Sequence, residues 1–136
     1  MIGSYLENRL IDLAALCGGR FDDARLSIED GMNRLATDPR PRAFGEDARW
    51  RYYRGAALVG LRRVSEAQTD LRFVLEAEGP QWLRGRAHKE LGKIADLAGD
   101  RVAALAEYRL ANRISRDQHD SSCEEDSAAL IKTRYR

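Results

Sequence analysis

Two segments of this chain repeat the same pattern of small and apolar residues 37 positions apart. The first copy lies within residues 53–71 and the second within residues 90–108. The matching positions are Gly55 with Gly92, Ala67 with Ala104, and Leu71 with Tyr108. A period of a few tens of residues is typical of helical hairpins that stack side by side and hide their apolar faces against one another. The repeat therefore predicts an all-α fold.

The spacing of apolar residues supports helices throughout, with breaks at proline and glycine. Pro39 and Pro41 interrupt the chain after the first apolar stretch, and Pro80 is well placed to begin a later helix. Gly99 followed by Asp100 is typical of a helix end and the N-cap of the next helix. No stretch alternates as a strand would. We therefore expect six helices in three antiparallel pairs, and a seventh after them.

The expected seventh helix follows a polar stretch at residues 115–121, which we interpret as a loop. Ser122 and Glu125 have the spacing of a capping box before the apolar residues 128–131. A helix there would cover the last hairpin and expose a polar outer face, as the end of a repeat stack requires. We therefore expect one domain over residues 1–136. Its parts are hairpins at about 4–37, 46–78 and 81–115 and a capping helix at about 122–134.

These residues give the chain a resemblance to the tetratricopeptide repeat (TPR) family. In that family the first helix of a hairpin carries an apolar residue followed by glycine, and the second helix carries small residues around a large one. The third hairpin matches through Leu91, Gly92, Ala95, Ala104, Tyr108 and Ala111, and the second through Gly55, Leu58, Ala67 and Leu71. The first hairpin matches least, because Asp12 stands where glycine is expected. The resemblance implies a right-handed α-solenoid of antiparallel helix pairs.

The glycines and alanines of the repeat have a physical rationale of their own. Glycine within a helix costs about 1 kcal/mol relative to alanine, so its presence at Gly55 and Gly92 indicates close approach of a neighbouring helix. Ala67 and Ala104 stand near the start of each partner helix, where the hairpin should be narrowest. Larger residues there should destabilise the packing by ~1–3 kcal/mol each. The predicted repeat-packing residues are Gly55, Ala67, Leu71, Gly92, Ala104 and Tyr108.

In the TPR family the first helices line a concave groove that holds a peptide, and the resemblance carries this groove to particular positions. The implied partner-binding residues are Arg49, Tyr52, Ala56, Arg86, Lys89 and Lys93, together with Val59, Asp96, Arg9 and Leu13. Basic and tyrosine side chains suit an acidic peptide or a free carboxylate. The alternative for the same residues is an ordinary solvated helix face. The family's residue set for chaperone tails is incomplete, since Ala56 and Tyr52 replace two of its members.

The charge balance gives no reason to expect nucleic acid or anionic lipid as a partner, since 23 basic and 22 acidic residues leave a net charge of +1. Residues 47–98 are mildly basic, with 10 basic and 7 acidic residues. Arginines cluster at positions 49, 51, 54, 62 and 63. Acidic Asp47, Glu66 and Asp70 lie nearby and favour a surface of ion pairs. A DNA-reading helix-turn-helix at 90–109 is a minor alternative, which the recurrence of the pattern at 53–71 weakens.

We find no catalytic motif and no spacing of metal ligands, and we expect no enzyme activity, no cofactor and no metal. The two cysteines, Cys17 and Cys123, suggest no disulfide framework, and the apolar spacing around Cys17 predicts a core position. The first residues lack the basic start and long apolar run of a signal peptide, and no stretch approaches the length of apolar residues that spans a bilayer. A cytoplasmic location is therefore expected, with an exported fragment as the open alternative.

The leading functional prediction is a non-enzymatic protein–protein interaction module that binds a peptide or partner protein in a mildly basic concave groove. The alternative is a self-associating scaffold, or the repeat segment of a larger protein. In that case Trp50, Trp82 or Phe44 would form the interface as exposed aromatic side chains. The sequence identifies neither the partner, nor the pathway, nor the oligomeric state.

Overall fold

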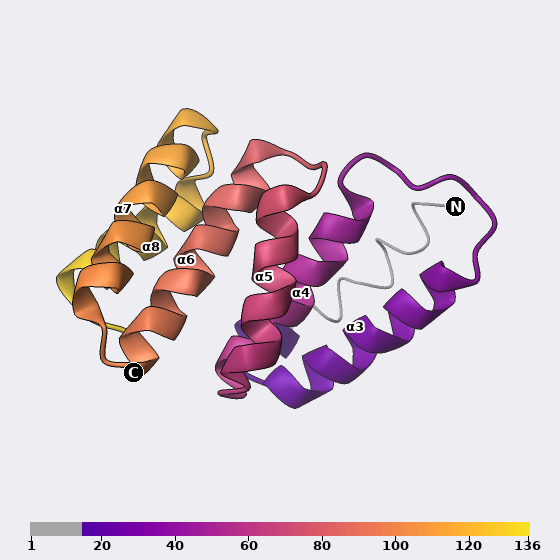
Figure 1. Cartoon of the computed structure of the whole chain (residues 1–136), viewed down its shortest axis with the longest axis horizontal. Coiled ribbons are helices and arrows are strands. Elements are labelled where there is room, and N and C mark those ends of the chain that lie inside the picture. Colours follow the sequence, from indigo (N-terminus) through magenta and orange to yellow (C-terminus); the bar gives the residue numbers. More distant parts are fainter. Residues whose placement is uncertain (1–14) are drawn as a thin grey trace.

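The computed structural model describes residues 15–136, which form helices and turns without a strand. The prediction of an all-helical protein is therefore confirmed for this part of the chain. Residues 15–17 are the end of an earlier helix. The helices that follow are α3 (Phe21–Ala36), α4 (Glu46–Gly60), α5 (Val64–Glu76), α6 (Gln81–Leu97), α7 (Arg101–Asp117) and α8 (Ser121–Lys132). Figure 1 shows them packed side by side.

Local signals set most helix boundaries. The turn after α6 contains Gly99 at φ 78°, and the Asp100 side chain accepts a hydrogen bond of 3.1 Å from the backbone N–H of Ala103. The predicted helix end and N-cap at this turn are thus confirmed. Residues 37–45, which contain Pro39 and Pro41, connect α3 to α4 without a helix. This is the longest connection between the described helices, and proline explains the break because it cannot continue a helix.

The boundary between α7 and α8 differs from the prediction. Helix α7 continues to Asp117 and α8 begins at Ser121, so the expected loop over 115–121 is wrong and only a three-residue turn remains. The N-cap of α8 is Asp120, whose side chain accepts a hydrogen bond from the N–H of Cys123, and not Ser122. An aspartate in the turn provides the same acceptor two residues earlier than the predicted capping box.

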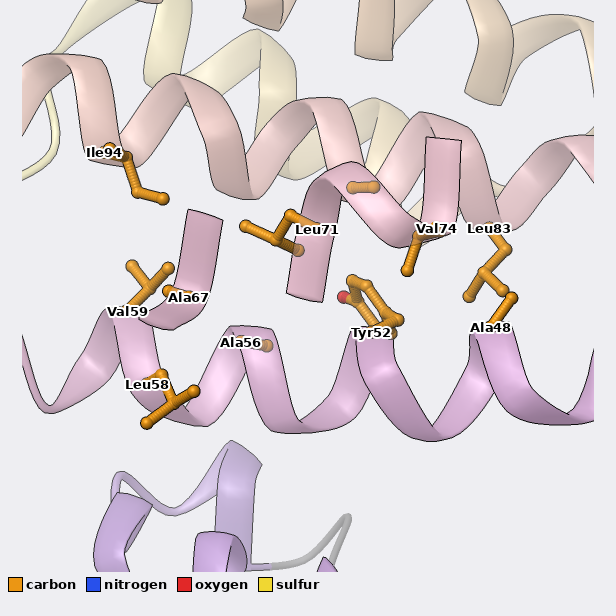
Figure 2. Packing of buried hydrophobic residues seen from close by; sticks show 11 residues of the cluster. Ala48, Tyr52, Ala56, Leu58, Val59, Ala67, Leu71, Val74, Leu83 and Ile94 are labelled. Atoms are coloured by element: carbon orange, nitrogen blue, oxygen red, sulfur yellow. The ribbon is translucent and has the colours of Figure 1, made fainter. Parts of the chain in front are cut away.

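Consecutive helices contact each other from α3 to α8, and α6 also contacts α4 and α8. The main core lies where α4 faces α5 and α6 (Figure 2). It includes Tyr52, Ala56 and Val59 of α4, Leu71 and Val74 of α5, and Leu83 and Ile94 of α6. Because α6 touches four other helices, α4, α5, α7 and α8, it is the element around which the described part of the chain is organised.

A second core joins α3 to α4 and changes one expectation. Ala24, Ile28 and Leu35 of α3 pack against Trp50 and Ala57 of α4. Trp50 is only 6% exposed, so the suggestion that it forms an exposed interface is wrong. Its side chain lies on the side of α4 that α3 covers.

The repeated small residues lie at helix contacts. A Cβ atom at Gly55 would lie 3.0 Å from Cδ2 of Leu71 in the next helix, and a Cβ atom at Gly92 would overlap the ring of Tyr108. Ala67 and Ala104 have no exposed surface. The two glycine contacts span the same sequence separation, so the repeat in the sequence has a counterpart in the packing of α4 on α5 and of α6 on α7.

Candidate binding groove

Most of the residues that the resemblance implies for partner binding line a single hollow of about 380 Å³. Of the six residues Arg49, Tyr52, Ala56, Arg86, Lys89 and Lys93, five line it: Tyr52 and Ala56 from α4, and Arg86, Lys89 and Lys93 from α6. Ser122 and Asp126 of α8 and Tyr135 beyond it complete one side. Arg49 does not line the hollow but stands on α4 one turn before Tyr52. Arg9 and Leu13 lie outside the described residues.

The floor of the hollow is formed by buried residues. Tyr52 is 5% exposed, Ala56 7% and Lys89 9%, so an ordinary solvated face is the wrong description of these positions. The rings of Tyr52 and Tyr53 lie 5.3 Å apart at an angle of 59°. Burial raises the pKa of Tyr52 well above its usual value, so its phenol stays neutral at physiological pH. The floor is therefore largely aromatic, with one buried ammonium group, that of Lys89.

Each basic residue of the hollow already has an acidic partner. Arg86 donates two hydrogen bonds, of 2.7 and 2.9 Å, to the carboxylate of Asp120. Lys89 lies 3.1 Å from a carboxylate oxygen of Asp126. The remaining pair is Lys93 with Glu90, at 2.9 Å. The positive charge expected of this surface is thus largely balanced within the protein.

These contacts keep the charges in place. The hydrogen bonds to Asp120 raise the pKa of Arg86 and, reciprocally, hold the pKa of Asp120 below its usual value. Burial lowers the pKa of Lys89, but Tyr52, Glu90 and Asp126 outweigh burial and leave its pKa above the ordinary value. The lysine therefore remains protonated at the floor of the hollow.

Sequence reasoning missed Asp120, which lies in the stretch expected to be a loop, and Asp126, which lies in the helix expected only to cap the stack. The signal that could have found them is the acidic character of the segment 120–126, set against the basic residues of α6. Its position over α6 depends on the turn between α7 and α8, which the sequence misplaced.

Arg49 differs from the other basic candidates. Its guanidinium lies 5.6 Å from the ring centroid of Trp82, and that of Arg86 lies 5.0 Å from the same centroid. Within residues 15–136 no carboxylate pairs with Arg49, and its buried Nε has no hydrogen-bond partner. Arg49 is therefore a cation stacked on Trp82 beside the hollow, whose charge no carboxylate of residues 15–136 balances.

Val59 and Asp96 do not contribute an accessible groove surface. Val59 is 1% exposed and belongs to the main core. Asp96 is 5% exposed, and its carboxylate accepts hydrogen bonds from Tyr108, Arg101 and the backbone N–H of Tyr135.

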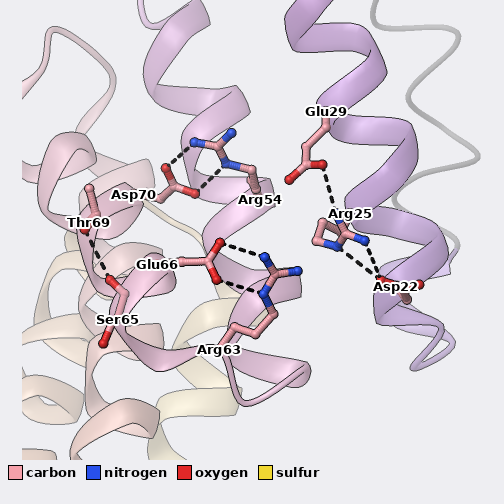
Figure 3. Close-up of polar contacts among 9 residues, drawn as sticks. All are labelled: Asp22, Arg25, Glu29, Arg54, Arg63, Ser65, Glu66, Thr69 and Asp70. Carbon is pink, nitrogen blue, oxygen red and sulfur yellow. Dashed lines mark hydrogen bonds and ion pairs between the residues drawn. The ribbon is translucent and has the colours of Figure 1, made fainter.

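Ion pairs engage three of the five clustered arginines, Arg51, Arg54 and Arg63. Figure 3 shows Arg54 bound to Asp70 of α5, at 2.7 and 2.8 Å, and Arg63 bound to Glu66. Arg51 also reaches Asp70, at 3.0 Å. This arrangement is the surface of ion pairs weighed above and leaves little unbalanced charge for nucleic acid.

The cysteines lie in different surroundings. Cys17 is exposed, so its predicted core position is wrong; it stands at the end of its helix, on the rim of the hollow. Cys123 is buried, and burial raises the pKa of its thiol. Within residues 15–136 no group of three or more His, Cys, Asp or Glu side chains is placed to hold a metal ion.

None of the described helices combines the length and the apolar character needed to cross a membrane. Comparison of the chain with models of protein families, with curated proteins and with solved structures finds no match. The geometry of the hollow and of its surroundings is therefore the ground on which a function is proposed.

Proposed function

We propose that this chain is a non-enzymatic protein–protein interaction module, a right-handed α-solenoid of TPR-like helix pairs that captures a peptide segment of a partner protein between α4 and α6. The solenoid is supported by the matching contacts of Gly55 with Leu71 and Gly92 with Tyr108, and by the contact of α4 with α6. In such a stack the first helices of neighbouring hairpins lie side by side and form the binding face.

The observation that carries the proposal is the hollow itself, with its aromatic floor and the unpaired guanidinium of Arg49 beside it. Rigid tyrosine side chains contribute contact area at low entropic cost. Arg49 offers a carboxylate donors that no group of the described chain uses. The ligand is therefore an acidic segment, with a carboxylate on Arg49 and apolar parts over Tyr52 and Tyr53.

The ion pairs in the hollow are compatible with an acidic ligand. The side chain of Asp126 is 55% exposed, whereas that of its partner Lys89 is 11% exposed. A ligand carboxylate can take the place of Asp126 on Lys89, because the displaced carboxylate is already in contact with water. Arg86 is held more firmly, since the side chain of Asp120 is only 8% exposed.

The test immobilises the full chain and uses it to select peptides from a library whose members differ in their number of acidic residues. Arg49→Gln is the test variant, because it removes the charge without breaking an ion pair of the described protein. Arg109→Gln, on an exposed position of α7, is the matched control. We expect selection of acidic peptides, at least tenfold weaker binding by Arg49→Gln, and unchanged binding by Arg109→Gln. Equal binding by all three proteins, or no preference for acidic peptides, contradicts the proposal.

Reversing the charge of Arg86 or Lys89 is a less suitable test. Both residues bind acidic groups of α8 or its N-cap, so a reversal would place like charges together and weaken the packing of α8. A loss of binding in such a variant would not separate the groove from the fold.

Self-association is a second candidate, favoured by one exposed aromatic residue. Phe44 is 70% exposed and lines a separate hollow of about 370 Å³ with Phe73 and Ala77. An exposed aromatic beside a depression that a second aromatic also lines suits contact with another chain. Sedimentation of the wild type and of Phe44→Ser over a range of concentrations tests this function. A wild type that stays monomeric throughout argues against it.

A further inference from the structure

The segment after α8 turns back onto the protein as an extended peptide. Thr133 has φ −136° and ψ 122°, and Tyr135 packs partly buried against the main core. Figure 1 places this end of the chain beside the turn that joins α6 to α7. The residues that receive it come from the turn between α4 and α5, from α6 and from α7, far from it in the sequence.

The backbone of the segment is held by a buried ion pair. Asp96, whose side chain is 1% exposed, accepts a 2.9 Å hydrogen bond from the N–H of Tyr135. Its partner Arg101, 3.0 Å away, donates 2.8 Å hydrogen bonds to the carbonyl oxygens of Leu130 and Ile131. One ion pair therefore holds both the last turn of α8, through Arg101, and the backbone of the extended segment that follows it, through Asp96.

The side chain of Tyr135 is held by two cations. The guanidinium of Arg62 and the ammonium of Lys93 each lie 5.0 Å from its ring centroid. Arg62 also donates a 2.8 Å hydrogen bond to its hydroxyl oxygen. These contacts require an aromatic ring with an acceptor at its far end, so they discriminate tyrosine from other residues.

The backbone of Arg62 indicates that this contact is maintained at a conformational cost. Arg62 has φ 63°, in the left-handed region where residues other than glycine are strained. The position 37 residues later is Gly99, at φ 78°, which adopts this conformation without strain. Arginine in place of glycine is explained by the contacts of its side chain with Tyr135.

From these contacts we propose that Arg62, Lys93, Asp96 and Arg101 form a binding site for an extended, tyrosine-containing segment, which residues 133–136 of the same chain fill. Tyr135 also lines the hollow between α4 and α6. Whether the site is occupied by Tyr135 therefore changes the shape of one end of that hollow. An effect of this change on ligand binding rests on the function proposed above. The site itself does not depend on the acidic ligand.

The experiment offers the full-length protein a labelled peptide of residues 131–136 and measures binding by fluorescence anisotropy. Tyr135→Ala should empty the tyrosine site and bind the peptide with a dissociation constant of about 0.1 mM or lower. The wild type should bind at least tenfold more weakly, because its own segment competes at an effective concentration of about a millimolar or more. A peptide with alanine in place of tyrosine should not bind.

A third protein combines Tyr135→Ala with Arg62→Gly. It should not bind the peptide, because the guanidinium that contacts the tyrosine is removed, although glycine relieves the backbone strain at position 62. Equal binding by wild type and Tyr135→Ala, binding by neither, or binding of the alanine peptide overturns the proposal. If Tyr135→Ala fails to fold, hydrogen exchange of the Tyr135 amide in the wild type replaces it. That amide should be protected and should exchange faster with excess peptide, and an unprotected amide overturns the proposal. None of these outcomes depends on acidic peptides, so this proposal and the groove proposal fail separately.

Discussion

The ring of Tyr108 in α7 occupies the space that a methyl group at Gly92 in α6 would need. The same relation, less tightly, links Leu71 in α5 to Gly55 in α4, where an added Cβ atom would lie 3.0 Å from the side chain. Glycine in the first helix thus admits a large side chain from the second helix, in two places along the chain.

We expect Gly92→Ala to destabilise the protein by about 1–3 kcal/mol, because the gain in helix propensity of about 1 kcal/mol is smaller than the overlap with a rigid ring. Gly55→Ala should have a smaller effect, since the branched end of Leu71 can rotate away. Urea unfolding of the two variants measures the difference. The double variant Gly92→Ala with Tyr108→Leu should recover part of the overlap penalty. A more stable Gly92→Ala would show that the ring is free to move.

The hydroxyl of Tyr108 donates a 2.8 Å hydrogen bond to the buried carboxylate of Asp96. Tyr108→Phe should reduce the free energy of unfolding by about 1–3 kcal/mol, because Asp96 would lose one of its donors while remaining charged and buried. Tyr53→Phe is the control, since its hydroxyl makes no hydrogen bond within the described residues, and it should change stability by less than about 0.5 kcal/mol. Chemical denaturation of both variants checks this, and similar effects would contradict the role given to Asp96.

Asp70 and Glu66, both on α5, allow the contribution of a buried ion pair to be compared with that of an exposed one. The side chain of Asp70 is 2% exposed and binds Arg51 and Arg54, whereas that of Glu66 is 58% exposed and binds Arg63. Asp70→Asn should cost about 2–4 kcal/mol, because it leaves two arginines without their counter-charge. Glu66→Gln should cost less than about 1 kcal/mol, as exposed pairs do. Thermal unfolding at two salt concentrations compares them, and equal losses would count against this distinction.

The Arg86–Asp120 pair predicts a specific dependence of stability on pH. Hydrogen bonds from Arg86 place the folded-state pKa of Asp120 below its ordinary value. The pair therefore stabilises the protein fully above about pH 4, which is the pKa of an aspartate in the unfolded state. This stabilisation is lost as the pH falls through the lower pKa that Asp120 has in the folded state. Asp120→Asn should lower stability at pH 7 and lose this part of the acid dependence, while asparagine still caps α8.

Unfolding by urea between pH 2.5 and pH 7 measures this effect. The difference in stability between wild type and Asp120→Asn should shrink as the solution becomes acidic. Asp100→Asn, at the N-cap of α7, is the control because Asp100 forms no ion pair within the described residues. A constant difference between wild type and Asp120→Asn across the range would refute the proposed coupling.

Much of the fold could be predicted from local signals. The helical spacing, the prolines at 39 and 41 and the Gly99–Asp100 turn act within a few residues, so they can be recognised without coordinates. The turn between α7 and α8 was misjudged because Asp120 and Ser122 both fit an N-cap. Trp50 and Cys17 were misplaced because helical spacing defines a stripe, but not which neighbouring helix covers it.

Only part of the candidate site could be predicted from the sequence. The basic and aromatic residues of α4 and α6 could be nominated because they share helix faces, and most of them line one hollow. Their acidic partners Asp120 and Asp126 could not, because they lie about 35 residues away on a helix whose position depends on the turn before it.

By itself, the order of residues determined that residues 15–136 form helices, where most of these helices end, and that small residues recur at matching positions of two hairpins. These properties follow from backbone conformation and from contacts within one turn or one hairpin. The tertiary structure alone decided which charges are compensated, that Arg49 keeps unused donors, and that Tyr135 lies between Arg62 and Lys93. The physical reason is that electrostatic pairing and burial depend on distances between distant segments, and packing sets those distances only when the helices assemble.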